Sequence, residues 1–138
     1  MAKRLVAVTL VLAALAGAAA AADEDPIDVA LDACLGKPDG QTTQGMVECL
    51  TTAYHAWDAA LNASYQAVIK TLAPEEAANL RAAQRAWIGF RDAEAAFLAS
   101  LVTPERGTIM RIFTNEMMVN LVKDRVGQLR LLEDDVDY

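Results

Sequence analysis

Histidine and cysteine, the side chains that most often bind metals or act as nucleophiles, are scarce in this 138-residue chain, which contains one histidine and two cysteines. His55 has neither a second ligand at helical spacing nor a Glu-x-x-His motif. Ser64 and Ser100 have no histidine placed to activate them. Asp92 and Glu94, two residues apart on a helix, point in different directions. We therefore expect no enzyme activity, no metal site and no cofactor.

The first 22 residues have the pattern of a secretory signal. A short basic head, Lys3 and Arg4, precedes an apolar run from Leu5 to about Ala16, and an A-x-A cleavage site fits several registers within residues 18–22. A membrane anchor is the competing interpretation, but the apolar run is shorter than the roughly 20 residues that a span needs. We expect a soluble protein, exported to the periplasm or the exterior, that does not insert into a membrane after signal removal.

Basic residues are outnumbered by acids, and the excess is uneven. Removal of Lys3 and Arg4 with the signal changes the formal charge from −7 to −9. Residues 23–58 hold eight acids and one base, and residues 133–138 add four acids. Nucleic acid is not an expected partner, because phosphate binding needs a basic stripe. The acidic surface would suit a basic protein partner, or would simply keep an exported protein soluble.

Patterns typical of β-strands are absent, as are linkers rich in glycine and serine. The chain contains only four prolines and seven glycines, and no segment of it alternates apolar and polar residues between turn signals. The length that remains after removal of the signal is typical of one domain. The sequence therefore predicts an all-α fold with one domain over residues 23–132, followed by an acidic tail at 133–138 that frays.

Three long amphipathic helices are predicted, because apolar residues recur every three or four positions over about 43–72, from Pro74 to about Thr103, and from Thr108 to about Leu132. Short connections between long helices imply an antiparallel bundle. The predicted inner faces of the three helices are, in order, Met46, Cys49, Leu50, Ala53, Trp57, Leu61, Ser64, Tyr65, Val68 and Leu72; Leu80, Ala83, Trp87, Phe90, Glu94, Phe97 and Leu101; and Ile109, Ile112, Phe113, Met117, Leu121, Gln128, Leu129 and Leu132.

A short leading helix is expected to begin at Asp25, a good N-cap, and Pro26, which suits a first turn. If residues 36–42 reverse the chain, Cys34 and Cys49 lie at nearly equal distances from the turn and can face each other. Two cysteines in an exported chain are more often paired than free, so a disulfide is expected, with two buried free thiols as the alternative. Closing a loop of about 15 residues would contribute roughly 3 kcal/mol.

One predicted helix carries polar groups on the side where an apolar seam is expected. Gln84, Trp87 and Arg91 are spaced i, i+3 and i+7 and line one face. Reversal of the chain before this helix would bring Asn62 opposite Gln84 and Asp58 near Arg91. A buried charge is tolerated only when it is paired, so we expect these side chains to satisfy one another in one buried layer, where loss of one charged partner costs about 3 kcal/mol or more. We assign this polar seam a role in helix register.

The stretch QRAWIGFRDAE at residues 84–94, together with DAALNASY at 58–65, resembles the N-terminal domain of LprI-like lysozyme inhibitors, a family of small secreted helical bacterial proteins. Members of this family usually carry a second cysteine pair. The corresponding positions hold Ala95 and a residue near Met117 in this chain. The absence of that pair fits a disulfide between Cys34 and Cys49, and it marks a departure from the family where the last two helices meet.

The resemblance, which spans roughly residues 34–132, implies a secreted protein that blocks a lysozyme by protein–protein contact. Lysozyme clefts carry catalytic carboxylates, often on basic proteins, so an inhibitor gains from acidic flanks and a projecting cationic group. The loop 103–108, with Glu105 and Arg106, is the candidate partner-contact loop, and an ordinary helix connection is the alternative. The alternative function is a periplasmic structural, envelope-stress or chaperone-like module without lysozyme activity.

Overall fold

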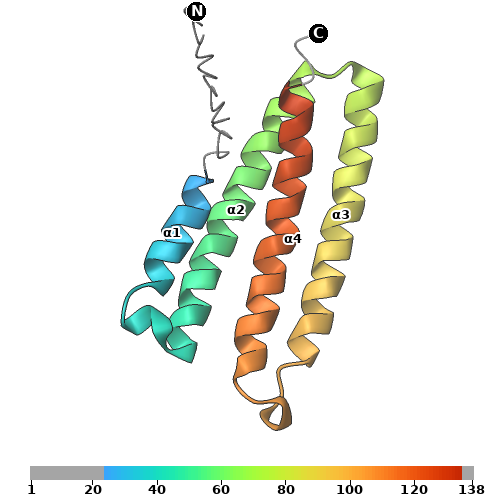
Figure 1. Cartoon of the computed structure of the whole chain (residues 1–138). Coiled ribbons are helices and arrows are strands. Elements are labelled where there is room, and N and C mark those ends of the chain that lie inside the picture. The colour runs from blue at the N-terminus through green and yellow to red at the C-terminus, as the bar shows by residue number, and fades with distance from the viewer. Residues whose placement is uncertain (1–23, 135–138) are drawn as a thin grey trace, which may run out of the picture.

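The computed structural model of the chain describes residues 24–134 and consists of four α-helices and two short 3₁₀ turns (Figure 1). No β-strand occurs between residues 24 and 134, and the all-α prediction is confirmed. The predicted signal at 1–22 lies outside the described residues, as do residues 135–138 of the predicted tail. The elements in chain order are α1 (Pro26–Leu35), η1 (Asp39–Gln41), α2 (Thr43–Thr71), α3 (Pro74–Ser100), η2 (Pro104–Arg106) and α4 (Ile109–Asp134).

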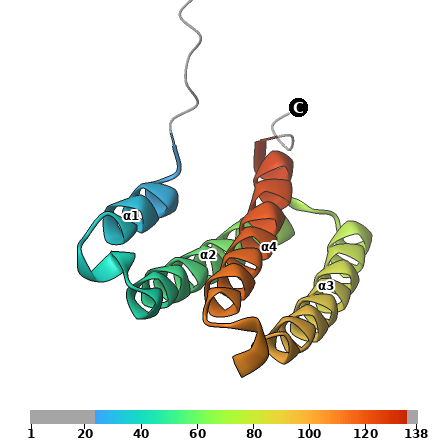
Figure 2. The ribbon, with the colours of Figure 1, turned by 60° about the horizontal axis from the view of Figure 1, so that its bottom comes forward.

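The three long helices alternate in direction along the chain, so α2 and α4 run the same way and α3 runs against both (Figure 1). α1 packs on α2, and α1 and α3 lie on opposite sides of the α2–α4 pair (Figure 2). The predicted antiparallel bundle of three long helices with a short leading helix is confirmed. The main packing interface joins α2 to α4, which are separated by a whole helix in the sequence.

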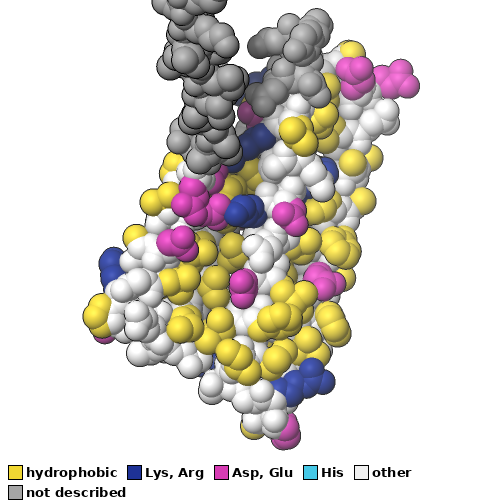
Figure 3. Space-filling model, viewed as in Figure 1, with side chains coloured by type: hydrophobic (Ala, Val, Ile, Leu, Met, Phe, Trp, Pro, Cys, Tyr) yellow, Lys and Arg dark blue, Asp and Glu magenta, His cyan; other side chains and the backbone are white. Residues whose placement is uncertain are grey.

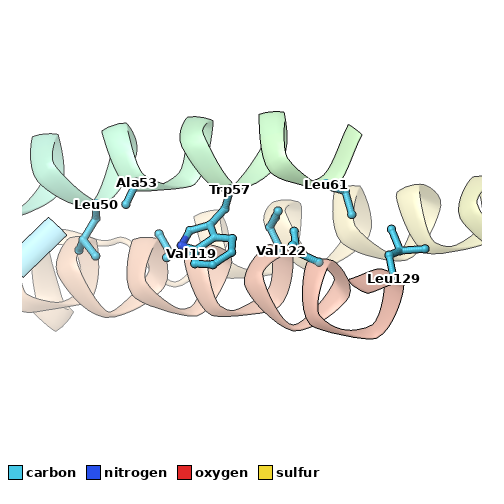
Figure 4. Close-up of a cluster of buried hydrophobic side chains, with 8 residues drawn as sticks. Leu50, Ala53, Trp57, Leu61, Val119, Val122 and Leu129 are labelled. Carbon is cyan, nitrogen blue, oxygen red and sulfur yellow. The ribbon is translucent and has the colours of Figure 1, made fainter. Parts of the chain in front are cut away.

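The hydrophobic core fills the space between α2 and α4. Each helix contributes residues spaced three or four positions apart, so each buries one continuous stripe (Figure 4). Trp57 is the largest of these side chains and is only 2% exposed. The α2 half of this core agrees with the predicted inner face. The eight buried core residues are Leu50, Ala53, Trp57 and Leu61 from α2 and Val119, Val122, Val126 and Leu129 from α4.

The predicted inner face of α3 is wrong by part of a helical turn. Phe90 and Phe97 were expected inside, but they are 53% and 55% exposed, whereas Leu98 is buried. The side of α3 that faces the bundle also carries the buried Gln84 and the half-buried Arg91. Polar side chains can occupy this face because α2 and α4 supply hydrogen-bond partners for them.

The predicted inner face of α4 is also wrong for most of its length. The stripe that packs against α2 consists of Val119, Val122, Val126 and Leu129. Of these four residues, the predicted inner face contains only Leu129. β-branched side chains of this size let two parallel helices approach closely and interdigitate. Larger apolar residues lie on another flank of α4, which the neighbouring helices do not cover. The exposed residues among those predicted to lie inside are Ile109, Phe113, Met117, Gln128 and Leu132.

α1 begins and ends where the sequence indicates. Asp25 caps it, with its Oδ1 accepting a hydrogen bond from the backbone N–H of Ile27 at 2.9 Å. The following turn is tight, and a Cβ on Gly40 would collide with the carbonyl oxygen of Cys34, so glycine is required there. This reversal brings Cys34 and Cys49 into a disulfide with a Cα–Cα distance of 5.8 Å, as predicted.

Candidate functional site

The polar seam lies where α3 faces α2. Arg91 Nη1 donates to Asp58 Oδ1 at 3.2 Å, and Arg91 Nη2 donates to Asp92 Oδ1 at 2.8 Å. The guanidinium carbon lies 5.7 Å from the centroid of the Trp87 ring, close enough for a cation–π interaction. Partial burial lowers the pKa of Arg91, but the hydrogen bonds that it donates to Asp92 and the nearby negative charges outweigh this effect and raise that pKa. The guanidinium is therefore held charged in a fixed position.

Asn62 and Gln84 do not hydrogen-bond each other, which corrects the expected network. Asn62 Nδ2 donates to the backbone carbonyl of Asp58 on its own helix at 2.9 Å. The buried Gln84 accepts from Arg125 Nε of α4 at 3.1 Å through its Oε1. Asn62 is exposed, and a side chain of this kind readily hydrogen-bonds the backbone carbonyl four residues earlier on its own helix. α4, which the seam was not expected to involve, supplies the partner of Gln84.

The Asp58–Arg91 ion pair is half-buried, with side-chain exposures of 37% and 20%, so the buried layer expected from the sequence is also corrected. Solvent reaches Asp58 because α3 packs on the bundle mainly through a few positions, and only Ala77, Gln84 and Leu98 of α3 are fully buried. The penalty for removing one partner is correspondingly smaller than for a pair in a closed core.

Replacing Asp58 or Arg91 by alanine is expected to lower the free energy of unfolding by about 1 kcal/mol, because water screens a half-exposed pair. The double variant should lose less than the two single variants together, with a coupling of about 0.5 kcal/mol. Urea unfolding curves of the four proteins measure this coupling. Arg85→Ala, at an exposed arginine on the same helix, is the matched control and should change the free energy by no more than about 0.5 kcal/mol. Strict additivity would show that the pair does not interact in solution.

The predicted partner-contact loop forms the short turn η2 at the end of the bundle where α3 passes into α4 (Figure 1). Glu105, Arg106 and Gly107 are exposed. Gly107 has a φ of 77°, a conformation that strains any residue with a side chain. Hydrogen bonds from the Glu105 backbone N–H and the Thr103 hydroxyl lower the pKa of Glu105. Within residues 24–134 no ion pair involves either charge of the loop, so both face the solvent.

Two ion pairs that the sequence did not reveal join α1 to α4 beside the core. Lys123 Nζ lies 2.6 Å from Asp28 Oδ2, and Arg130 Nη1 lies 2.7 Å from Asp25 Oδ2. Both cations also lie over the Trp57 ring, at 5.7 and 5.5 Å from its centroid. Burial opposes ionisation of Asp25, but its hydrogen bonds and the charge of Arg130 lower its pKa. These contacts hold α1 against α4, and we interpret them as structural.

A groove between α2 and α3 is the second feature that sequence reasoning missed. Its volume is about 270 Å³, and Arg81, Gln84 and Arg85 of α3 line it opposite Asn62 and Gln66 of α2. The three α3 residues are spaced i, i+3 and i+4, which places them on neighbouring positions of one helical flank. The spacing of these residues can be recognised in the sequence. It does not indicate a groove, however, because exposed arginines on a helix are common and the opposite wall is supplied by α2.

Among the described residues, no group of three or more histidine, cysteine, aspartate or glutamate side chains is placed to bind a metal ion. His55 is exposed on α2. None of the helices within residues 24–134 combines the length and the apolar character needed to cross a membrane.

Comparisons with known proteins match most of the chain. A family model described as "Lysozyme inhibitor LprI" matches residues 34–129. The crystal structure of an uncharacterised protein from Burkholderia thailandensis superimposes with a TM-score of 0.77, at 29% sequence identity, over 83% of this chain. The match covers 56% of that protein, so this chain spans little more than half of its length. No curated protein matches the chain significantly.

Proposed function

This chain belongs to the lysozyme inhibitor LprI family, and from that premise we propose that it is an exported protein that inhibits a lysozyme by protein–protein contact. The family match over residues 34–129 carries the proposal, because it includes the disulfide, the polar seam and the loop between α3 and α4. The signal pattern at residues 1–22 and the disulfide support export. The protein acts as a binding partner and not as an enzyme.

Mixing the purified mature protein with lysozymes of different classes, in a cell-wall lysis assay, tests this function. The expected result is saturable inhibition of at least one lysozyme, with basic lysozymes inhibited best, because the acidic chain accelerates association with them. That preference should weaken as the salt concentration rises. Full lysis at a large molar excess of the protein over every lysozyme of the panel would contradict the proposal.

The η2 loop is the proposed contact with the lysozyme cleft. It projects at one end of the bundle and presents Glu105 and Arg106 to the solvent on a connection stiffened by Pro104. A guanidinium is suited to this contact, because it pairs with carboxylates through two parallel hydrogen bonds. The cleft of a lysozyme offers such carboxylates as its catalytic groups.

Replacing Arg106 by glutamate is expected to raise the inhibition constant at least tenfold, a loss of about 1.4 kcal/mol of binding free energy, because it sets like charges against each other. The helical circular dichroism and the melting temperature should not change, since Arg106 is exposed. Lys70→Glu, an equal charge reversal at the far end of α2, is the matched control. An unaltered inhibition constant in folded Arg106→Glu protein would exclude this loop and direct attention to the acidic residues of 23–58.

A chaperone-like module is a second candidate, and the exposed apolar residues of α3 and α4 favour it. Phe90 and Phe97 share one side of α3, and Phe113 and Met117 share one side of α4. Hydrophobic side chains gather over these two helices on the face shown in Figure 3. Exposed apolar patches often bind other proteins. Suppression of the aggregation of a reduced, unfolded protein, without inhibition of any lysozyme, would favour this candidate.

A further inference from the structure

The α2–α3 groove carries positive charge on an acidic protein. Arg81 and Arg85 line it, and Arg125 of α4 contacts its inner wall through Gln84. Within residues 24–134, ion pairs to carboxylates involve only the cations Arg91, Lys123 and Arg130. The three arginines at the groove are therefore not neutralised by the described part of the chain.

Gln84 gives the groove a directed hydrogen-bond donor. Its side chain is buried at the inner wall, and its Oε1 is occupied by the hydrogen bond from Arg125 Nε at 3.1 Å. This bond fixes the orientation of the carboxamide, so its Nε2 is left to donate elsewhere. Within residues 24–134, Gln84 Nε2 donates no hydrogen bond, and it is not among the buried atoms that lack a partner. Arg125 itself meets only neutral oxygens, of Gln84 and Gln128.

Arg81, Arg85 and Gln84 all carry N–H donors and line the same groove, so the ligand that suits it is an acceptor with negative charge. Arg125 is partly buried, and burial lowers its pKa because no carboxylate compensates its charge. An additional anion would relieve this imbalance. The acidic surface elsewhere would repel a long polyanion such as nucleic acid, whereas a single carboxylate on a folded protein can approach a local positive site.

We propose that the groove between α2 and α3 binds a carboxylate side chain of a protein partner, with Arg81 and Arg85 supplying charge and Gln84 a directed N–H group. α3 lies at one edge of the bundle (Figure 2), and Arg81 and Arg85, which line the groove, are exposed. If the partner is a lysozyme, the inference rests on the proposed function and adds a second contact beside the η2 loop.

A titration with a tetraglutamate peptide, followed by NMR of the arginine Nε–H and glutamine side-chain amide signals, tests the groove without any lysozyme. We expect saturable shifts of the Arg85 and Gln84 signals, and at least a tenfold weaker affinity in the Arg81→Ala/Arg85→Ala variant. Lys70→Ala, which removes an exposed cation outside the groove, should bind the peptide as the wild type does.

Three results would overturn the carboxylate site: no saturable shift, equal affinity in the double variant, or equal shifts produced by inorganic phosphate at the same ionic strength. The last result would identify a general anion site. Arg81 and Arg85 are exposed and form no ion pair within the described residues, so the double variant should keep the urea unfolding curve of the wild type.

The lysis assay then tests whether a lysozyme is the partner. If the wild type inhibits a lysozyme, the Arg81→Ala/Arg85→Ala variant should have an inhibition constant at least tenfold higher. An unchanged constant would refute the groove as a lysozyme contact while leaving the proposed function intact. If the wild type inhibits no lysozyme, the proposed function fails, and the peptide titration alone decides whether the groove binds carboxylates.

Discussion

Replacing Trp57 by alanine is expected to lower the free energy of unfolding by about 3–5 kcal/mol, which is a large part of the stability of a domain of this size. Trp57 is 2% exposed and lies between α2 and α4, the two helices that share the core. The neighbouring valines are held by their own helix and cannot collapse into the space of an indole ring, so a cavity remains. Urea unfolding monitored by circular dichroism measures the loss.

Trp57 also supports the contacts between α1 and α4. The cations of Lys123 and Arg130 lie over its ring while they pair with Asp28 and Asp25 of α1. Removal of the ring leaves these cations without the apolar surface on which their side chains rest. The alanine variant should therefore lose stability in α1 as well as in the core, and amide hydrogen exchange in α1 should accelerate.

Two variants make the Trp57 prediction decisive. Trp57→Phe keeps most of the ring and also removes an indole N–H that is buried without an acceptor among residues 24–134, so it should lose only about 1–2 kcal/mol. Phe97→Ala deletes an aromatic ring that is 55% exposed, and the change should stay near 0.5 kcal/mol. Equal losses for Trp57→Ala and Phe97→Ala would show that the core does not lie where the structure places it.

Apolar spacing was sufficient to predict which face of α2 is buried. This helix packs on α1 and α4, so a wide apolar stripe serves two neighbours and leaves little ambiguity. Asp25, Pro26 and the turn around Gly40 likewise act locally, and the start of α1 and the disulfide followed from them. Helix caps, tight turns and the buried face of a helix with one dominant apolar stripe are the features of this fold that can be predicted from the sequence alone.

The registers of α3 and α4 could not be predicted in the same way, because each helix carries two apolar stripes. On α3, Phe90 and Phe97 compete with Trp87 and Leu98, and the buried stripe also contains Gln84. Hydrophobicity alone favours the phenylalanines. The choice depends on partners supplied by other helices, such as Arg125 for Gln84, 41 positions apart in the sequence. A pattern within one helix carries no information about such a partner.

The departure from the family pattern falls where α3 meets α4. Ala95 lies opposite Thr114 and Met118 across a cavity of about 230 Å³ between α3 and α4, the region to which the family resemblance assigns the missing second cysteine pair. α3 buries only three residues, fewer than α2. Of the three long helices, α3, which carries the groove arginines, is the least buried, so Arg81 and Arg85 remain exposed.

Loss of the disulfide is the second change expected to have a large effect. The Cys34→Ala/Cys49→Ala variant should be less stable by about 3 kcal/mol, because the bond closes a loop of about 15 residues and restricts the unfolded chain. α1 has ten residues, too few to form a stable helix alone. Besides the disulfide, its apolar contacts to the core and its two ion pairs to α4 hold it in place.

Hydrogen exchange followed by mass spectrometry should locate this loss. Amides of α1 should exchange much faster in the Cys34→Ala/Cys49→Ala variant, whereas amides of α2 and α4 around Trp57 should stay protected, because the eight buried core residues all come from these two helices and α1 only packs against them. The unreduced mature protein should contain the linked pair, and reduced wild type should match the double variant in stability. Two alkylatable thiols in protein recovered from the periplasm would refute the bond. Unchanged exchange in α1 would show instead that the ion pairs to Asp25 and Asp28 suffice to hold the helix.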